Sequence, residues 1–224
     1  MKIFDKIPKK VFQGLAYFFG TFAIALIFLL ILLWAGNKIQ DWKTKQYSYN
    51  IIREESVLTY QEKKSQLVRA ANSYIDSVAP TSNLTGYAIV ENCEKYDLDI
   101  IFVLSHAQIE SNFGTRGMAA KTNSIFNVGA IDNMPYEKIS DRYKYSHPDH
   151  SIEPYMRLLY ANYITNGKTE LDLIGRFVDK KGKRYASDED YERKLLDLYK
   201  QIKQSTDLSL LQGEMHRYKI ISGM

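Results

Sequence analysis

The sequence predicts a mostly helical protein, in which one N-terminal transmembrane helix is followed by one helical domain. Three observations carry this prediction. Residues 15–34 form an apolar run without a charge, and apolar residues recur at helical spacing in several later segments. Gly, Asn and Asp are concentrated in 113–150, where no regular pattern is visible, so loops are expected there. The domain, of about 150 residues, is large enough for one hydrophobic core.

The apolar run is long enough to cross a membrane. At about 1.5 Å per residue, it matches the roughly 30 Å hydrocarbon core of a bilayer, so we expect a transmembrane helix over 15–36. A cleaved signal peptide is the alternative. Its apolar region usually has only about 7–15 residues and is followed by small side chains, whereas this run ends in Leu33-Trp34-Ala35. An uncleaved anchor is therefore the preferred interpretation.

The basic residues lie on both sides of this run. The chain carries a formal charge of +4, of which residues 1–14 supply +3 and residues 38–46 supply +2, so that 47–224 carry −1. A nearly neutral body argues against a nucleic-acid partner. The four Lys before the run, against three just after it, favour a cytoplasmic 1–14 by a small margin. One Cys excludes an intramolecular disulfide and a paired-Cys zinc motif, and no cofactor is expected.

The remaining chain is predicted to be helical except for one interval of loops. Residues 37–64 are polar and lack Pro and Gly, which indicates a helical stalk that continues into the domain. The domain itself is expected over 65–204. Its helices are predicted at 65–79, 84–96, 100–112, 151–165 and 187–204, with loops and a short hairpin at 113–150. Residues 205–224 are expected to form a tail or a loosely docked helix.

The most informative segment for chemistry is 107–114, AQIESNFG. Here a carboxylate ends an otherwise apolar helix, and Glu110 shares a helix face with Val103, His106 and Ala107. Desolvation at the rim of an apolar surface favours the uncharged form of a carboxyl group. Glycoside hydrolysis needs such a protonated carboxylic acid near neutral pH. The spacing alone is also compatible with a solvated Glu near a helix end.

Three sequence elements resemble the glucosaminidase domain of glycoside hydrolase family 73. The first is the helix end in 107–114, with its Ala-Gln, Glu-Ser and aromatic-Gly pairs. The second is 122–129, TNSIFNVG, and the third is 184–191, RYASDEDY, which resembles the family's Tyr-Ala-(Thr/Ser)-Asp-x-x-Tyr signature. Residues 151–157 are similar to the helix that follows the variable lobe in that family. The resemblance covers about 65–204, with the elements in the family's order.

The resemblance implies an α+β, lysozyme-like fold, with a helical core and a small loop or β-hairpin lobe. It also implies hydrolysis of peptidoglycan at the bond after N-acetylglucosamine. Carried over residue by residue, Glu110 is the general acid, and Tyr185 is the tyrosine that orients the substrate or the attacking water. The residues expected to bind the glycan are Ser111, Phe113, Asn123, Phe126 and Asn127.

Several of these residues also have a structural interpretation. For Phe126 a core position is favoured over direct stacking. The side chains of Ser111 and Asn127 are equally compatible with a capping or turn role. Tyr185 is evenly divided between packing and site, whereas Tyr191 is interpreted as structural. Two departures from the family pattern stand out: Phe113 replaces a frequent Trp, and Asn127 replaces the usual Gly after the Phe, so the backbone is expected to differ there.

The second carboxylate is not defined by a motif. A retaining enzyme needs one roughly 5 Å from the acid, and an inverting enzyme roughly 6.5–9.5 Å away. The candidates in the lobe are Asp132, Glu137, Asp141 and Asp149. Glu137, near the middle of the lobe, is preferred, although the substrate's acetamido group could replace a carboxylate. The histidines His106, His147 and His150 form no metal pattern and are interpreted as surface or core residues.

Three functions follow from these expectations. The preferred one is a membrane-anchored endo-β-N-acetylglucosaminidase, whose catalytic domain lies on the periplasmic or extracellular side and binds peptidoglycan strands. The second is a lytic transglycosylase of the same fold, against which the 184–191 element argues. The third is an inactive wall-binding module in a larger envelope, secretion or phage assembly.

Overall fold

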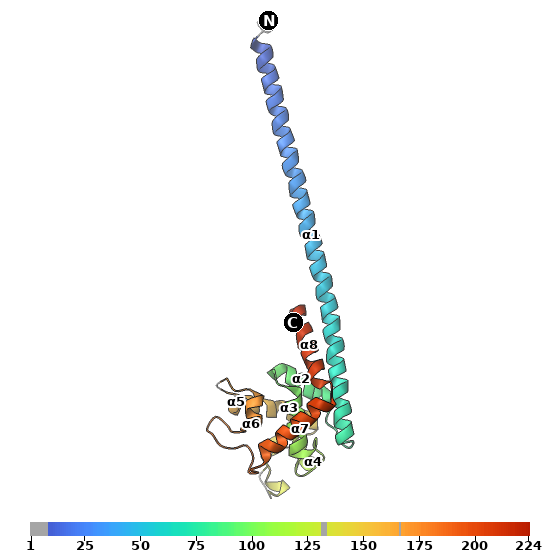
Figure 1. Ribbon diagram of the computed structural model, residues 1–224, viewed down its shortest axis with the longest axis vertical. Helices are drawn as coiled ribbons and strands as arrows, with labels where there is room; N and C mark the ends of the chain where they lie inside the picture. The colour runs from blue at the N-terminus through green and yellow to red at the C-terminus, as the bar shows by residue number, and fades with distance from the viewer. Residues whose placement is uncertain (1–8, 131–133, 166) are drawn as a thin grey trace. The chain divides into compact units, whose positions relative to one another are not determined.

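The computed structural model describes residues 9–130, 134–165 and 167–224 (Figure 1). This part of the chain is mostly helical, as predicted, and its one β-type pairing is an isolated antiparallel bridge between Val178 and Arg184. The α-helices are α1 (Lys9–Val78), α2 (Gly86–Tyr96), α3 (Ile100–Ser111), α4 (Ala119–Thr122), α5 (Ile152–Asn162), α6 (Glu170–Gly175), α7 (Tyr191–Ser205) and α8 (Leu208–Ser222). Three 3₁₀ helices, η2 (Tyr136–Lys138), η3 (Asp141–Tyr143) and η4 (Pro148–Ser151), lie between α4 and α5.

The chain divides into two compact units between Glu55 and Ser56. The described part of the first unit belongs to α1 and contains a window with a mean hydropathy of 2.6, none of which is buried. This stretch is long and apolar enough to cross a membrane. A signal sequence near an N-terminus has the same features, so its role as an anchor is taken up below as a proposal.

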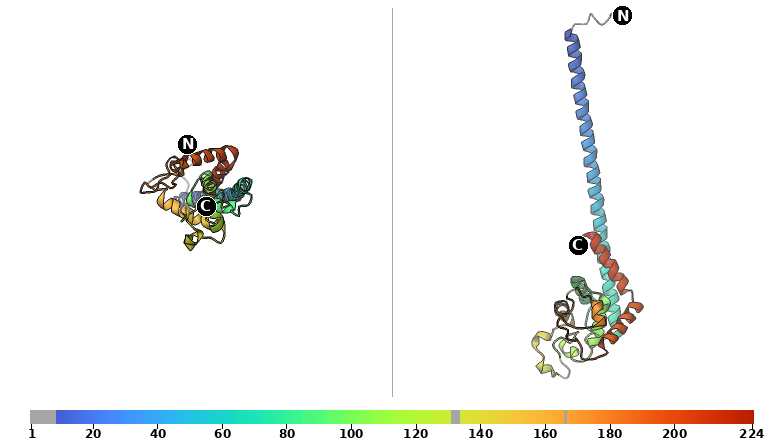
Figure 2. Two further views of the ribbon diagram at one scale, coloured as in Figure 1. Left: turned by 90° about the horizontal axis from the view of Figure 1, so that it is seen from below. Right: turned by 60° about the vertical axis from the view of Figure 1, so that its left-hand side comes forward.

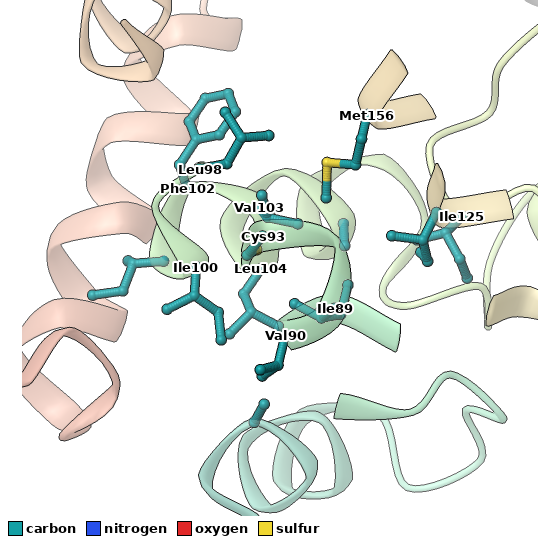
Figure 3. Packing of buried hydrophobic residues seen from close by; sticks show 14 of the residues in the cluster. Ile89, Val90, Cys93, Leu98, Ile100, Phe102, Val103, Leu104, Ile125 and Met156 are labelled. Atoms are coloured by element: carbon teal, nitrogen blue, oxygen red, sulfur yellow. The ribbon is translucent and has the colours of Figure 1, made fainter. Parts of the chain in front are cut away.

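In the second unit, α3 forms the centre of the hydrophobic core. Its first eight residues, from Ile100 to Ala107, are all buried, because the helix is apolar on every side. The Asp99 carboxylate caps its first turn by accepting from the backbone N–H groups of Ile101 and Phe102. Figure 3 shows the surrounding layer, with Ile89, Val90 and Cys93 of α2 and Met156 of α5 packed around Val103 and Leu104.

The end of α1 belongs to this core. Leu67, Ala71 and Ile75 are buried, and α2 begins directly against them. A Cβ at Gly86 would lie 2.7 Å from the Val68 carbonyl oxygen, so only glycine permits this close approach. The 65–79 helix predicted from the sequence is therefore present as the last part of α1.

A carboxylate on α2 joins three helices. Glu94 accepts hydrogen bonds from Tyr60 at 2.6 Å and Lys64 at 2.8 Å, both on α1, and pairs with Lys219 of α8 at 2.8 Å. Figures 1 and 2 show α8 running beside the end of α1. Leu208 and Met215 of α8 are buried. The 205–224 segment, expected as a tail or loosely docked helix, is thus a helix that contributes to the core.

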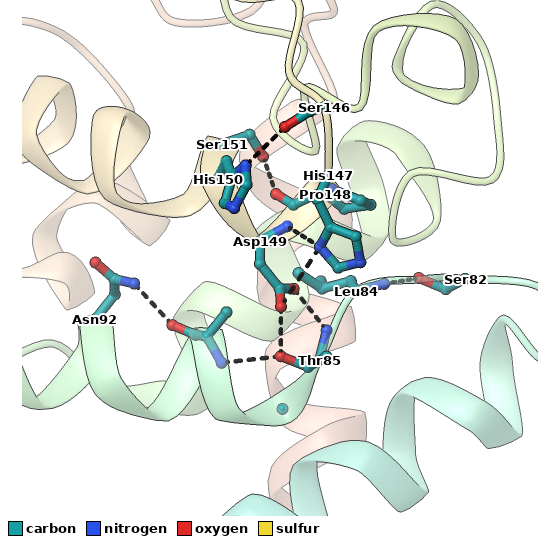
Figure 4. Close-up of polar contacts among 12 residues, drawn as sticks. Ser82, Leu84, Thr85, Asn92, Ser146, His147, Pro148, Asp149, His150 and Ser151 are labelled. Atoms are coloured by element: carbon teal, nitrogen blue, oxygen red, sulfur yellow. Dashed lines mark hydrogen bonds and ion pairs between the residues drawn. The ribbon is translucent and has the colours of Figure 1, made fainter.

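The lobe at 113–150 differs from the predicted short hairpin. Its described residues form α4 and the three 3₁₀ helices, with no strand. Asp149 fixes its exit by accepting hydrogen bonds from the backbone N–H and the hydroxyl of Thr85, both at 2.8 Å, and His147 lies 3.6 Å from the same carboxylate (Figure 4). The polar turns of the lobe are held by such side-chain contacts, so no strand pairing is needed.

Two helix boundaries differ from the sequence prediction. The helix expected at 187–204 begins at Tyr191, because Asp188 accepts from the Asp190 backbone N–H and holds a turn before it. The helix expected at 151–165 ends at Asn162. The short helix α6 was not predicted. It begins with a reciprocal capping box between Thr169 and Asp172.

Candidate active site

Glu110 lies on the last turn of α3, where the helix emerges from the core. Its side chain is 13% exposed. The helix ends one residue later, and three consecutive residues, Asn112, Phe113 and Gly114, adopt φ values of 48°, 57° and 83°. This left-handed conformation is uncommon for a bulky residue such as Phe113, and such backbone tends to occur at functional sites. The carboxyl group therefore projects from a sharply ended helix.

Tyr191 makes the direct contact with this carboxyl group. Its hydroxyl donates a hydrogen bond of 2.5 Å to Glu110 Oε1 from the first residue of α7. Burial and then the nearby Glu110 charge raise the pKa of the Tyr191 hydroxyl well above its usual value, so it remains a donor. The interpretation of Tyr191 as structural is corrected, because it touches the candidate acid.

His106 lies one turn before Glu110 and is fully buried. Its Nδ1 atom forms a hydrogen bond with the Tyr155 hydroxyl of α5. Its Nε2 atom lies 3.4 Å from Glu110 Oε1, which is longer than an ordinary hydrogen bond. Of the two positions expected for His106, surface or core, the structure shows the core. Helical spacing predicted that His106 and Glu110 share a face, but the contact with Tyr155 was not predicted.

Tyr185 reaches the same group of rings from the loop before α7. It is half-buried, stacks on Phe177 with ring centres 4.5 Å apart, and meets His106 edge-on at 4.9 Å. Its hydroxyl donates to the Phe126 carbonyl oxygen at 3.4 Å. Burial and the Glu110 charge raise the pKa of Tyr185. It therefore packs beside the candidate acid and keeps one part exposed.

Two aromatic residues expected to bind sugar rings are buried in this structure. Phe113 is 0% exposed and packs edge-on against Tyr74 of α1, with ring centres 6.1 Å apart. Phe126 is 1% exposed and stacks on Tyr155 at 3.5 Å. Neither ring offers a face to a ligand, because both are covered by core residues. For Phe113 the expected contact with the glycan is corrected to a packing role, whereas for Phe126 the burial agrees with the core position favoured from the sequence.

The polar residues of the first two motifs hold the backbone around Glu110. Ser111 donates to the Ile125 carbonyl oxygen at 2.6 Å and accepts from the Gly114 backbone N–H. Asn127 donates to the Glu110 carbonyl oxygen at 2.7 Å. Asn127 also adopts a φ of 48°, the conformation that the family's glycine takes without strain. These contacts join the 122–129 segment to the end of α3.

Asn123 has a similar local role. It ends α4 in the left-handed conformation and donates to the Tyr145 carbonyl oxygen at 2.8 Å. This bond connects the second motif to a later part of the lobe. Ser111, Asn123 and Asn127 each donate a side-chain hydrogen bond to a backbone carbonyl oxygen. Glycan binding by these three residues therefore stays a prediction.

The candidate second carboxylates have different surroundings. Asp149 is engaged by Thr85, and Asp141 is exposed and pairs with Lys144 at 2.9 Å. Glu137 is exposed in η2, and no hydrogen bond or ion pair found among the described residues joins it to Glu110. Asp132 lies outside the described residues. Within the described ranges, no three His, Cys, Asp or Glu side chains are grouped closely enough to hold a metal ion.

A helical domain that presents one partly buried carboxyl group among aromatic rings has one of the features of a glycoside hydrolase site. Comparison with known families agrees. The model of the Glucosaminidase family, described as mannosyl-glycoprotein endo-beta-N-acetylglucosaminidase, matches residues 86–204. The chain therefore belongs to this family, glycoside hydrolase family 73.

Two curated relatives support the same family. Both are provisionally named endo-beta-N-acetylglucosaminidase, from two strains of Streptococcus pneumoniae, TIGR4 and R6. Each is 26% identical to this chain over 117 residues, which is 52% of the chain. The matched part spans only 17% and 16% of the two relatives' own lengths, so their remaining parts have no counterpart in the match.

Proposed function

We propose that this protein is a membrane-anchored endo-β-N-acetylglucosaminidase that cleaves the β-1,4 bond after N-acetylglucosamine in peptidoglycan. Glu110 is the general acid of the reaction. The proposal joins the family of residues 86–204 to the charge-free apolar stretch near the N-terminus. The name of the two relatives indicates the type of bond that is cleaved, and the apolar stretch supports action at the cell envelope.

The observation that carries the proposal is the environment of Glu110. Its side chain is 13% exposed, while Tyr191 and His106 lie against Oε1. A carboxyl group that borders aromatic rings and still reaches solvent can hold a proton and deliver it to a bound ligand. Glu110 is bonded to Tyr191, and its charge contributes, after burial, to the raised pKa of Tyr155 and Tyr185.

The reaction has a simple atom balance. The Glu110 carboxylic acid gives its proton to the glycosidic oxygen, and the bond between that oxygen and the anomeric carbon breaks with its electron pair on oxygen. A water oxygen then bonds to the anomeric carbon, and its proton goes to a base. The products are a new reducing N-acetylglucosamine end and a free hydroxyl on the next sugar.

The test is product analysis with the full chain in detergent. Wild-type protein is incubated with purified cell-wall sacculi, and the soluble products are reduced with borohydride and analysed by mass spectrometry. We expect reduced N-acetylglucosamine ends, and a loss of at least about 100-fold in rate for Glu110→Gln. Glu62→Gln, an exposed carboxylate on α1, is the matched control and should keep wild-type activity.

The other outcomes identify the alternatives. Full activity of Glu110→Gln would refute its role as the acid. Anhydro-muramic products would show a lytic transglycosylase. Sacculi that bind the protein without being cut would show a wall-binding module.

Glu137 is proposed as the base or second carboxylate. Of the described candidates, Asp149 already bonds to Thr85 before α2 and Asp141 to Lys144 within the lobe, which leaves Glu137. We expect Glu137→Gln to lose at least about tenfold in kcat. Unchanged kcat would instead favour assistance by the substrate's acetamido group, and Asp141→Asn is the control on the same lobe.

The anchor is proposed over residues 15–36, with 1–14 in the cytoplasm and the hydrolase domain outside. An uncleaved protein should have an intact mass near 26.0 kDa and should stay with membranes in alkaline carbonate. Protease added to intact spheroplasts should digest the domain and spare the N-terminal segment. A shorter mature protein released into the medium would identify a signal peptide instead.

A further inference from the structure

We propose that His106 is a positioning residue for the reaction. As a neutral imidazole protonated at Nε2, it directs this N–H toward Oε1 of Glu110, so that the transferable proton of the carboxylic acid is carried by Oε2. This inference rests on the proposed role of Glu110 as general acid. Beyond that role, it specifies Oε2 as the oxygen from which the proton leaves, and His106 and Tyr191 as the side chains that determine this choice.

The first observation is the burial of the imidazole. His106 is 0% exposed, and its ring lies within about 6 Å of six aromatic rings. These belong to Phe102, Phe126, Tyr155, Phe177, Tyr185 and Tyr191. The ring is therefore closed off from solvent, and its polar atoms depend on neighbouring side chains for hydrogen bonds.

The second observation concerns the hydrogen atoms. The Tyr155 hydroxyl is buried, and among the described residues it bonds only to His106 Nδ1. If Tyr155 donates, Nδ1 accepts and the ring proton must be on Nε2. In the other tautomer, or in the imidazolium, Nδ1 would donate and the Tyr155 proton would have no acceptor among these residues. Because buried polar groups are nearly always paired, the Nε2–H tautomer is favoured.

The third observation is that both contacts fall on the same oxygen. Tyr191 donates to Oε1, and Nε2 of His106 also faces Oε1. Two donors stabilise an oxygen that carries no proton. In the protonated acid, the proton is therefore expected on Oε2, to which no described residue bonds. The partly exposed carboxyl group then presents its acidic oxygen to a bound glycan.

The distance from Nε2 to Oε1 is 3.4 Å, and Nε2 has no hydrogen-bond partner in the described part of the chain. Contacts at catalytic groups are often long without substrate and shorten in the complex. Leaving the buried Nε2–H group of His106 without a partner is energetically costly, and a shorter distance to Oε1 would remove this cost. The inference thus predicts a shorter distance from His106 Nε2 to Glu110 Oε1 when a glycan is bound.

The titratable groups that face the ring come from three elements. Glu110 lies on the same helix as His106, and Tyr155 lies on α5. Tyr185 lies before α7, and Tyr191 is the first residue of α7. Burial raises the pKa of all three tyrosines well above the usual value. These hydroxyls therefore stay protonated near neutral pH, which keeps Tyr155 available as the donor that selects the tautomer.

The kinetic test compares two substitutions at His106 in the full chain in detergent, with soluble glycan oligomers as substrate. His106→Gln places an amide N–H near the position of Nε2, whereas His106→Leu supplies no donor. We expect kcat to fall at least about tenfold in His106→Leu, with KM changed less than about threefold, and His106→Gln to keep kcat within about threefold of wild type. His216→Gln on α8 is the control and should behave like the wild type.

The spectroscopic test observes the tautomer directly. The chain has four histidines, and the signals of His106 in a ¹⁵N spectrum are those lost in His106→Gln. We expect the bonded proton on Nε2 in the wild type. In Tyr155→Phe, which removes the hydroxyl donor, we expect a mixture of the two neutral tautomers.

Each result supports or overturns the inference. Wild-type kcat in His106→Leu, an equal loss in His106→Gln, or a proton on Nδ1 in the wild type would overturn it. In these cases an inactive Glu110→Gln would still leave the proposed function standing. Full activity of Glu110→Gln would instead refute the proposed function, and the two failures are therefore distinguishable. If His106→Leu does not fold, His106→Gln, Tyr155→Phe and the wild-type spectrum still decide.

Discussion

Among the described residues, the polar side-chain contacts of Glu110 all fall on one of its two carboxyl oxygens, Oε1. Tyr191 lies 81 positions further along the chain, yet its hydroxyl is 2.5 Å from Oε1. The backbone of the same residue is held by Asn127 at 2.7 Å. Side chain and backbone of Glu110 are thus fixed from two different elements, which is the arrangement that a precisely oriented acid needs.

Replacing Tyr191 by Phe tests the contact at this scale. The variant keeps the ring and removes the hydroxyl that donates to Oε1, so the carboxyl group loses its main fixed partner. We expect kcat to fall by about tenfold to 100-fold, with a small change in KM. Steady-state kinetics on soluble glycan oligomers gives both values.

Tyr160→Phe is the matched control, because Tyr160 is 53% exposed on α5, away from Glu110. Thermal unfolding of both variants separates a catalytic loss from a folding defect. Wild-type kcat in Tyr191→Phe would show that the hydroxyl does not orient the acid.

The place of Glu110 could be predicted from the sequence, but the side chains around it could not, for a physical reason. Helical periodicity puts Glu110 at the apolar rim of its own helix, whereas its expected role as the acid came from the family resemblance. Tyr155 and Tyr191 come from α5 and α7, and only tertiary packing brings their hydroxyls to this helix. Phe113 was expected to contact the glycan because aromatic rings suit sugars, but such rings also suit a core, and Phe113 lies there together with Phe126, for which a core position was favoured.

At the scale of elements, the long periodic segments were predicted well and the short ones were not. The helix expected at 100–112 is α3, and the one expected at 84–96 is α2. The six-residue α6 depends on one capping box, a signal too local to stand out. The lobe at 113–150 has few apolar residues, so its 3₁₀ helices are set by individual side-chain bonds, such as those of Asp149, that no pattern reveals.

The contact between α1 and α2 can be tested at Gly86. A Cβ at this position would meet the Val68 carbonyl oxygen at 2.7 Å and the Asn72 backbone nitrogen at 2.8 Å. Since backbone atoms cannot move aside individually, we expect Gly86→Ala to lower the free energy of unfolding by about 1–3 kcal/mol. Urea unfolding followed by circular dichroism measures this change.

Gly213→Ala is the matched control for Gly86→Ala. Gly213 lies inside α8 with nothing within 4 Å of its would-be Cβ, so alanine should raise helix stability by about 0.5–1 kcal/mol. Equal effects of the two substitutions would contradict the close approach of α1 and α2.

The junction of α1, α2 and α8 makes stability depend on pH through Glu94. Burial alone would raise the pKa of Glu94, but hydrogen bonds from Lys219, Lys64 and Tyr60 outweigh it and hold the pKa at about 2. A lowered pKa contributes stability above the unfolded value of about 4.5, and this contribution is lost as the pH falls toward 2. After allowance for solvent screening, we expect a loss of about 1 kcal/mol.

Urea unfolding at pH 6 and pH 2.5 measures this loss. Other carboxylates titrate in the same range, so the informative quantity is the difference between wild type and Glu94→Gln. This difference should shrink at low pH, whereas Glu62→Gln, with an exposed carboxylate on α1, should follow the wild type at both pH values. A constant difference would mean that Glu94 is not paired as described.

At the scale of the whole molecule, the family match is smaller than the folded unit. The match begins at residue 86 and ends at 204, whereas the second compact unit begins at Ser56 and ends at Met224. The parts outside the match bury large apolar side chains in the same core, namely Leu67, Ile75, Leu208 and Met215. The end of α1 therefore belongs to the core of the second unit, although it lies outside the family match.

The last prediction concerns where the chain can be cut. Four large buried side chains contribute about 1.5–3 kcal/mol each. This sum is comparable with the whole stability of about 5–15 kcal/mol that domains of this size have. We therefore expect residues 56–224 to unfold cooperatively on heating and to degrade sacculi without detergent, and residues 86–204 to show no cooperative transition. Residues 56–204, which keep the end of α1 and lack α8, should fall between them. Circular dichroism melting and the dispersion of amide NMR signals measure this order, and a well-folded, active 86–204 fragment would show that the ends of the chain only cover a core that is complete without them.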